Sequence, residues 1–248
     1  MPGGGAVSVL RTRWGGIELV SAGAGEVFVL LHGLQSSASV WDGVLEHLSG
    51  VRSLAVNFPG RGGSARWAPE FGPIPSYYTV DTFTRVLRAV VESVGREVSI
   101  VGWSMGAMVA LHYVATYGDA GVSRLFLCSG ATRVAGRVST FAATSFEELE
   151  REIEQRSRKA SLPAAADPLA VAYTWLSMSN FDLRGRLAQV RVPTTVIHGT
   201  LDKECPFEEA EIMAAEIFSA RLVPLPECGH FILREAPGTV ARAIQCTL

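Results

Sequence analysis

Three residues with the capacity for acyl-transfer chemistry, a serine, an aspartate and a histidine, follow one another along the chain. Ser104 is the centre of a Gly-x-Ser-x-Gly pentapeptide, Gly102–Gly106, which comes after the apolar run 98–101 and opens a helical pattern at 107–111. A strand that turns into a helix through this pentapeptide is the usual setting of a nucleophilic serine. The sequence therefore predicts a nucleophile at Ser104.

The spacing of the two glycines has a steric reason. A chain that passes from strand to helix in one tight turn strains the central residue, and we expect a positive φ at Ser104. Side chains two residues to either side would collide, and glycine at 102 and 106 removes that collision. The turn presents the hydroxyl at the carboxyl edge of a sheet, where the following helix offers free N–H groups.

The base is expected to be a histidine, because a serine hydroxyl is a poor nucleophile until its proton is taken. Among the five histidines, His230 follows the last strand-like segment through a short loop and stands beside a glycine. We expect it to be the base, with a surface-loop histidine as the alternative. The other four occupy predicted helices or strand ends, where structural or surface roles are expected: His32, His47, His112 and His198.

The acid that orients the histidine should lie between the serine and the histidine if the order is serine, acid, histidine. Asp202 lies in the turn 199–202 at the carboxyl edge of the penultimate strand, where site residues of open α/β sheets gather. Glu204 is the alternative. Asp167 and Asp182 fall in a helical insertion, where helix-cap or surface roles are expected.

An oxyanion formed at the substrate carbonyl needs two backbone N–H donors. One should belong to Met105, the residue after the nucleophile, and the other to the loop after the third strand. In that loop, 32–35, we expect Leu34 to be the donor, with Gln35 as the alternative.

The elements around these residues alternate between strand and helix after an opening hairpin. Strand-like segments at 7–14 and 17–21 flank Gly15-Gly16, which is typical of a two-residue turn. Further strands are expected at 26–32, 52–58, 98–101, 125–128, 192–198 and 220–225. Helices are expected at 41–48, 80–94, 105–117, 210–218 and 236–246. This alternation predicts a mostly parallel sheet with helices on both faces.

One stretch, residues 131–190, interrupts the alternation because it holds no convincing buried strand. Helical patterns at 144–159 and 171–178 indicate a helical cap inserted into a core formed by 1–130 and 191–248. Five residues are candidates for the substrate-binding wall, with ordinary core packing as the alternative: Trp41, Trp103, Phe141, Trp175 and Met178. Four basic residues could attract an acidic carrier protein, with a solvated helix face as the alternative: Arg151, Arg156, Arg158 and Lys159.

Composition excludes several other classes of protein. The 248 residues are 48% hydrophobic and 19% charged, with a net charge of −2, as expected of a soluble globular protein that does not bind nucleic acid. The apolar runs are too short to cross a bilayer, and the N-terminus lacks the pattern of a signal peptide. A cytoplasmic location is therefore the default expectation. The four cysteines show no zinc or disulfide spacing. We expect no metal, no cofactor, and a monomer or small homo-oligomer.

Five motifs in order resemble the α/β-hydrolase superfamily over nearly the whole chain. They are 31–33, 57–64, 102–106, 198–202 and 229–230. The resemblance implies an eight-stranded sheet, a Ser-Asp-His triad and no metal. Within the superfamily, the chain is most similar to the pimeloyl-carrier-protein methyl ester esterases and related small serine esterases. This similarity rests on residues 102–106, on 182–184 and on 201–202 before Pro206. The chain departs from the pattern of this family at two positions. Asn57 stands where many relatives have aspartate, and Ala107 stands where they have a second glycine after the elbow.

The sequence accordingly predicts hydrolysis of a carboxylic ester through an acyl-enzyme on Ser104. The substrate would be a small acyl ester, free or on an acyl carrier protein. A thioesterase, a C–C bond hydrolase or a lyase could use the same three residues, and a ligand receptor could use the same fold. Dehalogenase and epoxide hydrolase chemistry is disfavoured, because the elbow carries serine instead of aspartate.

Overall fold

A single eight-stranded sheet organises the protein, and the computed structural model describes residues 5–134, 140–159 and 166–246 of it. The strands are β1 (Ala6–Thr12), β2 (Gly15–Gly23), β3 (Glu26–Leu31), β4 (Val51–Val56), β5 (Val98–Trp103), β6 (Val122–Cys128), β7 (Thr194–Gly199) and β8 (Ala220–Leu225). Their order across the sheet is β1-β2-β4-β3-β5-β6-β7-β8. The strand β2 pairs antiparallel with β1 and β4, and all other neighbours pair parallel, so the predicted fold class is confirmed.

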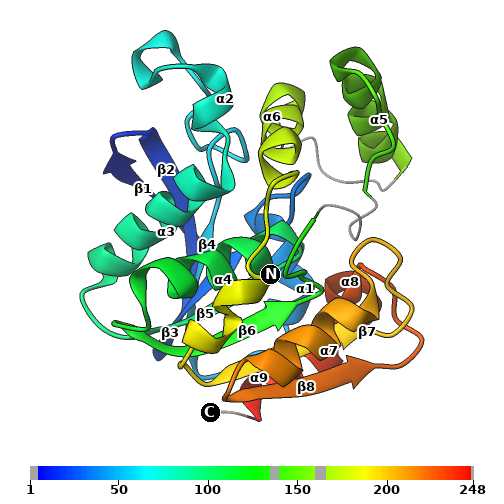
Figure 1. Ribbon diagram of the computed structural model, residues 1–248. Coiled ribbons are helices and arrows are strands. Elements are labelled where there is room, and N and C mark those ends of the chain that lie inside the picture. Colours follow the sequence, from blue (N-terminus) through cyan, green and yellow to red (C-terminus); the bar gives the residue numbers. More distant parts are fainter. Residues whose placement is uncertain (1–4, 135–139, 160–165, 247–248) are drawn as a thin grey trace.

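Helices cover both faces of the sheet (Figure 1). The α-helices are α1 (Asp42–Leu45), α2 (Ile74–Tyr77), α3 (Val80–Val94), α4 (Met105–Tyr117), α5 (Phe146–Lys159), α6 (Pro168–Met178), α7 (Phe207–Glu216), α8 (Ile232–Glu235) and α9 (Pro237–Gln245). Short 3-10 helices cover Ala38–Trp41, Pro69–Phe71 and Arg184–Gln189. The connections in the parallel part place the carboxyl ends of β3, β5, β7 and β8 at one edge.

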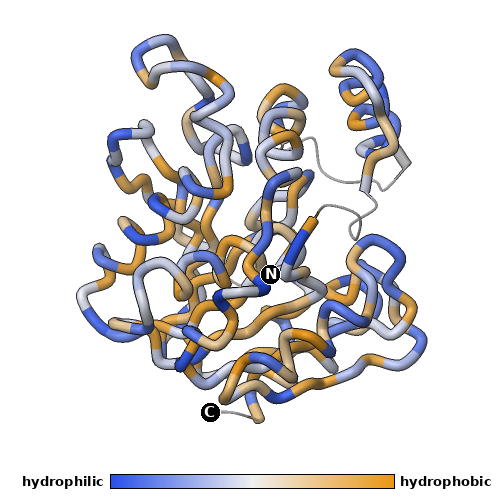
Figure 2. The backbone as a smooth tube through the Cα atoms, viewed as in Figure 1, coloured by the Kyte–Doolittle hydropathy of each residue, from blue (hydrophilic) through white to orange (hydrophobic). Residues whose placement is uncertain are grey.

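Side chains that alternate along the central strands build two hydrophobic clusters, one on each face. Along β3, Val27 and Val29 belong to the cluster with α3, α4 and α7, whereas Phe28 and Leu30 belong to the cluster with α1, α8 and α9. This strand is buried on both faces, as its continuous apolar sequence predicts. Figure 2 shows the hydrophobic stretches concentrated in the sheet and in the helices packed on it.

The segment between β6 and β7 contributes α5 and α6, which stand above the carboxyl edge of the sheet (Figure 1). Asp167 caps the start of α6, because its carboxylate accepts hydrogen bonds from the N–H groups of Leu169 and Ala170. No helix in the described part of the chain is long and apolar enough to cross a bilayer.

One prediction of local structure is wrong. The turn of the first hairpin lies at Arg13-Trp14, and Gly15 already pairs with Thr12 as the first residue of β2. Thr12 holds this turn, since its hydroxyl donates to the Gly15 carbonyl and accepts from the Trp14 N–H. The helix expected at 236–246 is present as α9, and a short helix that the sequence did not predict, α8, precedes it, with Ala236 between the two in a non-helical conformation. Pro237 accounts for the separation of α8 from α9, because proline disfavours helix at the preceding residue.

Candidate active site

Ser104 occupies the sharp turn between β5 and α4, with φ 55° and ψ −120°. The sequence predicts this positive φ, and the two flanking glycines explain how the turn accommodates it. A Cβ atom at Gly102 would lie 2.3 Å from the Gly106 carbonyl oxygen, and one at Gly106 would lie 2.3 Å from the Leu31 carbonyl oxygen. Any larger residue at either position would force the turn apart, and the serine hydroxyl would move with it.

The three residues predicted from the sequence lie in one chain of hydrogen bonds. His230 Nε2 is 2.9 Å from Ser104 Oγ, and His230 Nδ1 is 2.8 Å from Asp202 Oδ2. The serine comes from the elbow after β5, the aspartate from the loop after β7, and the histidine from the loop after β8. The parallel order of these strands therefore brings together residues up to 126 positions apart.

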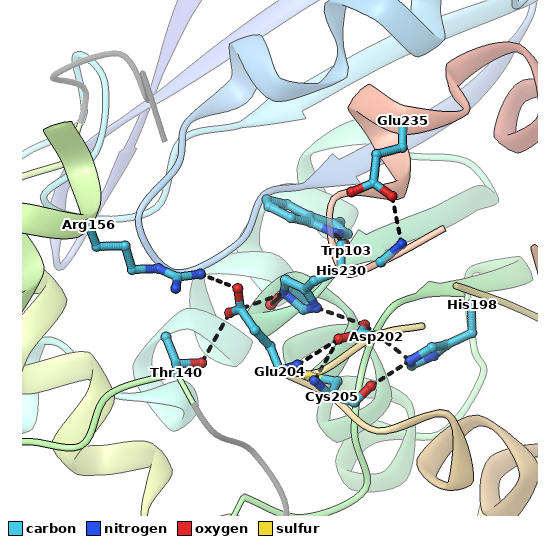
Figure 3. Close-up of polar contacts among 11 residues, drawn as sticks. Trp103, Thr140, Arg156, His198, Asp202, Glu204, Cys205, His230 and Glu235 are labelled. Atoms are coloured by element: carbon cyan, nitrogen blue, oxygen red, sulfur yellow. Dashed lines mark hydrogen bonds and ion pairs between the residues drawn. The ribbon is translucent and has the colours of Figure 1, made fainter. Parts of the chain in front are cut away.

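Asp202 is held from both sides. Its Oδ1 accepts hydrogen bonds from the N–H groups of Glu204 and Cys205, each at 2.9 Å. Its Oδ2 faces both His230 and His198, whose Nε2 lies 3.3 Å away. Burial would raise the pKa of Asp202, but the hydrogen bonds with His198 and His230 outweigh it and hold the pKa well below its ordinary value. The carboxylate is thus ionised at neutral pH and fixed in orientation (Figure 3).

His198 and Glu204 flank the hydrogen-bonded chain of Ser104, His230 and Asp202. His198, for which strand-end packing was expected, lies against Asp202 and also donates to the Cys205 carbonyl at 2.9 Å. Glu204, the alternative acid, lies on the opposite side of the imidazole, with Oε2 3.8 Å from His230 Nε2. Asp202 is therefore the carboxylate positioned to orient His230, while Glu204 lies on the side facing the serine.

Trp103 connects the serine elbow to the histidine loop. Its indole N–H donates to the main-chain carbonyl of His230 at 3.0 Å, and the two rings lie 5.5 Å apart. The ring also packs so closely on Gly33 that a Cβ there would meet it at 2.7 Å. One side chain thus touches the nucleophile turn, the histidine loop and the loop after β3, a role that its type alone did not indicate.

The two amides expected to bind an oxyanion belong to Leu34 and Met105. In the part of the chain that the structure describes, neither N–H donates a hydrogen bond to the protein. The backbone of Leu34 is fixed through its carbonyl group, because the carbonyl oxygen accepts two hydrogen bonds from the Arg61 guanidinium, at 3.0 and 3.3 Å. Arg61 is fully buried and was missed as a site residue, because only the contact with Leu34 reveals it.

A narrow cavity opens in front of Ser104. Of the candidate wall residues, Trp103, Trp175 and Met178 line it, together with Leu34 and Gln35. Phe141 lines an adjoining cavity and packs edge-on against Trp175. Trp41, the remaining candidate, does not line this cavity: it is fully buried in the cluster with α1, α8 and α9. Core packing on the opposite face of the sheet explains its burial.

The basic residues of α5 have different surroundings. Arg156 contacts Glu204 in the active-site cavity, Arg158 pairs with Glu154 on the surface, and Arg151 donates to the Glu147 carbonyl. The side chain of Lys159 lies outside the described part. Among the described residues, no group of three or more histidine, cysteine, aspartate or glutamate side chains is arranged to hold a metal ion.

Fold and site together define a hydrolase. Residues 28–243 match the sequence profile described as "Alpha/beta hydrolase family", and the chain belongs to that family, which confirms the resemblance. It is 27% identical to AB hydrolase superfamily protein YisY of Bacillus subtilis over 84% of this chain and 86% of that protein. It is 25% identical to pimeloyl-[acyl-carrier protein] methyl ester esterase of Nitrosomonas europaea, covering 86% and 92%. The solved esterase EaEST of Exiguobacterium antarcticum has the same fold, with TM-score 0.82 and 22% identity over 97% and 98% of the chains.

Proposed function

We propose that this protein hydrolyses a carboxylic ester through an acyl-enzyme formed on Ser104. The observation that carries the proposal is the continuous hydrogen-bonded chain from Ser104 Oγ through His230 to Asp202, with links of 2.9 and 2.8 Å. Such a chain converts a weakly acidic hydroxyl into a nucleophile, because the imidazole accepts the proton as the oxygen attacks. The named function of the esterase relatives supports the same reaction.

Acylation uses every part of the site. Ser104 Oγ attacks the ester carbonyl carbon while His230 Nε2 takes the hydroxyl proton, and Asp202 stabilises the resulting imidazolium. The Leu34 and Met105 N–H groups stabilise the oxyanion of the tetrahedral intermediate. Collapse of the intermediate breaks the bond to the alkoxide, which leaves as an alcohol with the proton from His230.

Deacylation repeats the sequence with water. His230 removes a proton from the water molecule as its oxygen attacks the acyl-enzyme carbonyl. The second tetrahedral intermediate then expels Ser104 Oγ, which recovers its proton from His230. The products are a carboxylic acid and a regenerated enzyme, so the cycle needs no cofactor.

Residues 131–190 act in this proposal as a cap on a hydrolase core formed by 1–130 and 191–248. Three contacts between the two parts support this role. Gln35 donates to the Ile153 carbonyl of α5 at 3.0 Å, Arg61 donates to the Thr174 hydroxyl of α6 at 3.2 Å, and Arg156 contacts Glu204. The cap thereby supplies the aromatic and sulfur-containing wall opposite Ser104, formed by Trp175 and Met178.

The substrate class follows from this wall and from the relatives. Apolar side chains on the cap favour an apolar acyl chain over a sugar or nucleotide. Several relatives at 25–28% identity are named pimeloyl-[acyl-carrier protein] methyl ester esterase, which favours a small acyl ester, free or attached to a carrier protein.

The test is a turnover screen with p-nitrophenyl esters, methyl esters and acyl thioesters, comparing the wild type with Ser104→Ala. We expect ester turnover to fall by about 10⁴-fold or more in the variant, because members of such a triad act as a unit. Ser76→Ala, a change at an exposed serine remote from the cavity, is the matched control.

Three results would redirect the proposal. Thioester turnover that exceeds ester turnover would make the protein a thioesterase. Normal ester turnover by Ser104→Ala would remove Ser104 as the nucleophile. Failure of a fluorophosphonate probe to label Ser104 in the folded wild type would favour a receptor that uses the same fold.

A further inference from the structure

The wall of the active-site cavity contains a pair of opposite charges that joins α5 to the loop after β7. The Arg156 guanidinium donates to Glu204 Oε1, and the two side chains are only 27% and 15% exposed. The Thr140 hydroxyl donates to Glu204 Oε2 at 3.4 Å. Figure 3 shows Arg156 reaching from α5 toward Glu204, beside His230.

This ion pair lies where two cavities meet. The cavity at Ser104 has a volume of about 30 Å³, which corresponds to roughly one water molecule. A second cavity, of about 360 Å³, is within the size range of ligand pockets. Both are lined by Thr140, Arg156 and Phe231, whereas Glu204 lines the inner one. Arg156 is therefore part of the wall between the space at the nucleophile and the larger space beyond it.

We propose that the Arg156–Glu204 ion pair is a specificity determinant that sets which acyl chains reach Ser104, an inference that rests on the proposed esterase function. An acyl chain bound to Ser104 has little room in the inner cavity. A longer chain must extend into the outer cavity, and Arg156 must leave Glu204 to make way. The cost of separating the two charges then falls on long acyl chains more than on short ones.

A purely structural role for the pair makes a different prediction. If the pair only held α5 on the core, its loss would change turnover of all esters by the same factor. The ratio of kcat/KM values for long and short esters separates the two cases. The ratio also cancels any effect of Glu204 on the chemistry at His230, 3.8 Å away.

The experiment measures kcat/KM for p-nitrophenyl acetate, butyrate, hexanoate and octanoate. The variants are Arg156→Met, which keeps an unbranched apolar side chain, and Glu204→Gln, which keeps the side-chain shape without its charge. The control is Arg158→Met, on the same helix, which removes an exposed pair with Glu154. We expect the octanoate-to-acetate ratio to rise about fivefold in either variant, the size usual for one ion pair, and to stay unchanged in the control.

Arg156→Met combined with Glu204→Gln should behave like either single variant, because one interaction is lost in each case. Unchanged ratios in both single variants, with acetate turnover that depends on Ser104, would overturn this inference and leave the esterase function standing. An equal rise in Arg158→Met would overturn it as well. Absence of ester turnover in the wild type would overturn the esterase function and the inference together. If Arg156→Met does not fold, the ratio in Glu204→Gln decides alone.

Discussion

The buried guanidinium of Arg61 donates two hydrogen bonds to the main-chain carbonyl of Leu34. It also donates to the Pro59 carbonyl at 3.0 Å and to the Thr174 hydroxyl at 3.2 Å. Burial lowers the pKa of Arg61 to about 10, so the side chain keeps its charge at neutral pH. A buried cation thus fixes the residue whose N–H we propose as an oxyanion donor.

Replacing Arg61 should affect kcat more than KM. In Arg61→Met, the Leu34 carbonyl loses both donors, so the backbone at Leu34 can rotate and carry its N–H away from the oxyanion. We expect kcat to fall by up to about 100-fold, the loss typical of one oxyanion donor. Arg61→Lys restores one charged donor nitrogen in place of the two on the guanidinium and should recover part of kcat. Steady-state kinetics on folded variants checks this, and equal changes in kcat and KM for both variants would argue against a positioning role.

Asp202→Asn should abolish most activity with little change in shape. The asparagine amide would donate to His230 Nδ1, so the proton would sit on Nε2 and His230 would present a donor instead of an acceptor to Ser104. Loss of the correct tautomer costs about 10⁴-fold in kcat in comparable triads. Steady-state kinetics with an ester substrate measures the change in kcat. A loss of less than about tenfold would point to Glu204 as the functional acid.

Asn57→Asp should destabilise the protein. Asn57 is buried, and its amide group donates to Glu18 Oε2 at 2.5 Å while its carbonyl accepts from the Ala38 N–H. A carboxylate there would face Glu18 without a proton between them. We expect the free energy of unfolding to fall by about 2 kcal/mol at pH 7 and to recover partly in acid.

Urea unfolding of Asn57→Asp at pH 7 and pH 5 measures this effect. The double variant Asn57→Asp with Glu18→Gln is the control, because it places an amide opposite the new carboxylate and should regain most of the loss. Wild-type stability in Asn57→Asp alone would contradict the argument.

His32 should make the protein less stable as the pH falls below about 6.5. Burial, aided by the charge of Arg61, lowers the pKa of His32 from 6.5 to about 3 in the folded state. Between these values the unfolded chain binds a proton that the folded protein does not. This group therefore lowers the free energy of unfolding by up to about 1.4 kcal/mol per pH unit as the solution becomes more acidic.

Urea unfolding between pH 7 and pH 4 measures the slope. In the folded protein the His32 ring accepts from the Phe58 N–H at 3.2 Å and contacts the Gly33 carbonyl at 2.8 Å. His32→Gln retains groups able to make such bonds but does not titrate. The free energy of unfolding of this variant should depend on pH less steeply than that of the wild type, by about the 1.4 kcal/mol per pH unit that one proton contributes. A slope equal to that of the wild type would refute the assignment to His32.

The sequence predicts the elbow at Ser104 because its constraint is local. Glycines at 102 and 106 follow from collisions with the main chain within and beside the turn, and these depend little on the rest of the fold. Asp202 and His230 were found from the rule that loops at one edge of a parallel sheet meet. That rule needs only the order of the strands and not the details of packing.

Residues that act through long-range contacts escaped sequence reasoning. Arg61 lies within the motif 57–64 and Glu204 is the alternative acid, but their contacts with Leu34 and Arg156 join positions 27 and 48 apart along the chain, and the sequence does not indicate them. The placement of Trp41 in the cluster with α1, α8 and α9 also depends on long-range contacts. The helical spacing around Trp41 indicates that its side chain is buried. Which face of the sheet it packs on depends on the path that the chain takes through the whole fold.

The ties between the α5–α6 segment and the core limit how freely this protein can be recombined with its relatives. Arg61 needs a hydroxyl at Thr174, and the Gln35 amide needs an acceptor at Ile153. A chimera that exchanges residues 131–190 would bring in a new wall but leave a buried guanidinium without one of its acceptors. A working chimera would therefore have to exchange Arg61 together with this segment. The residues that must be exchanged as one set thus include a position outside the contiguous insertion.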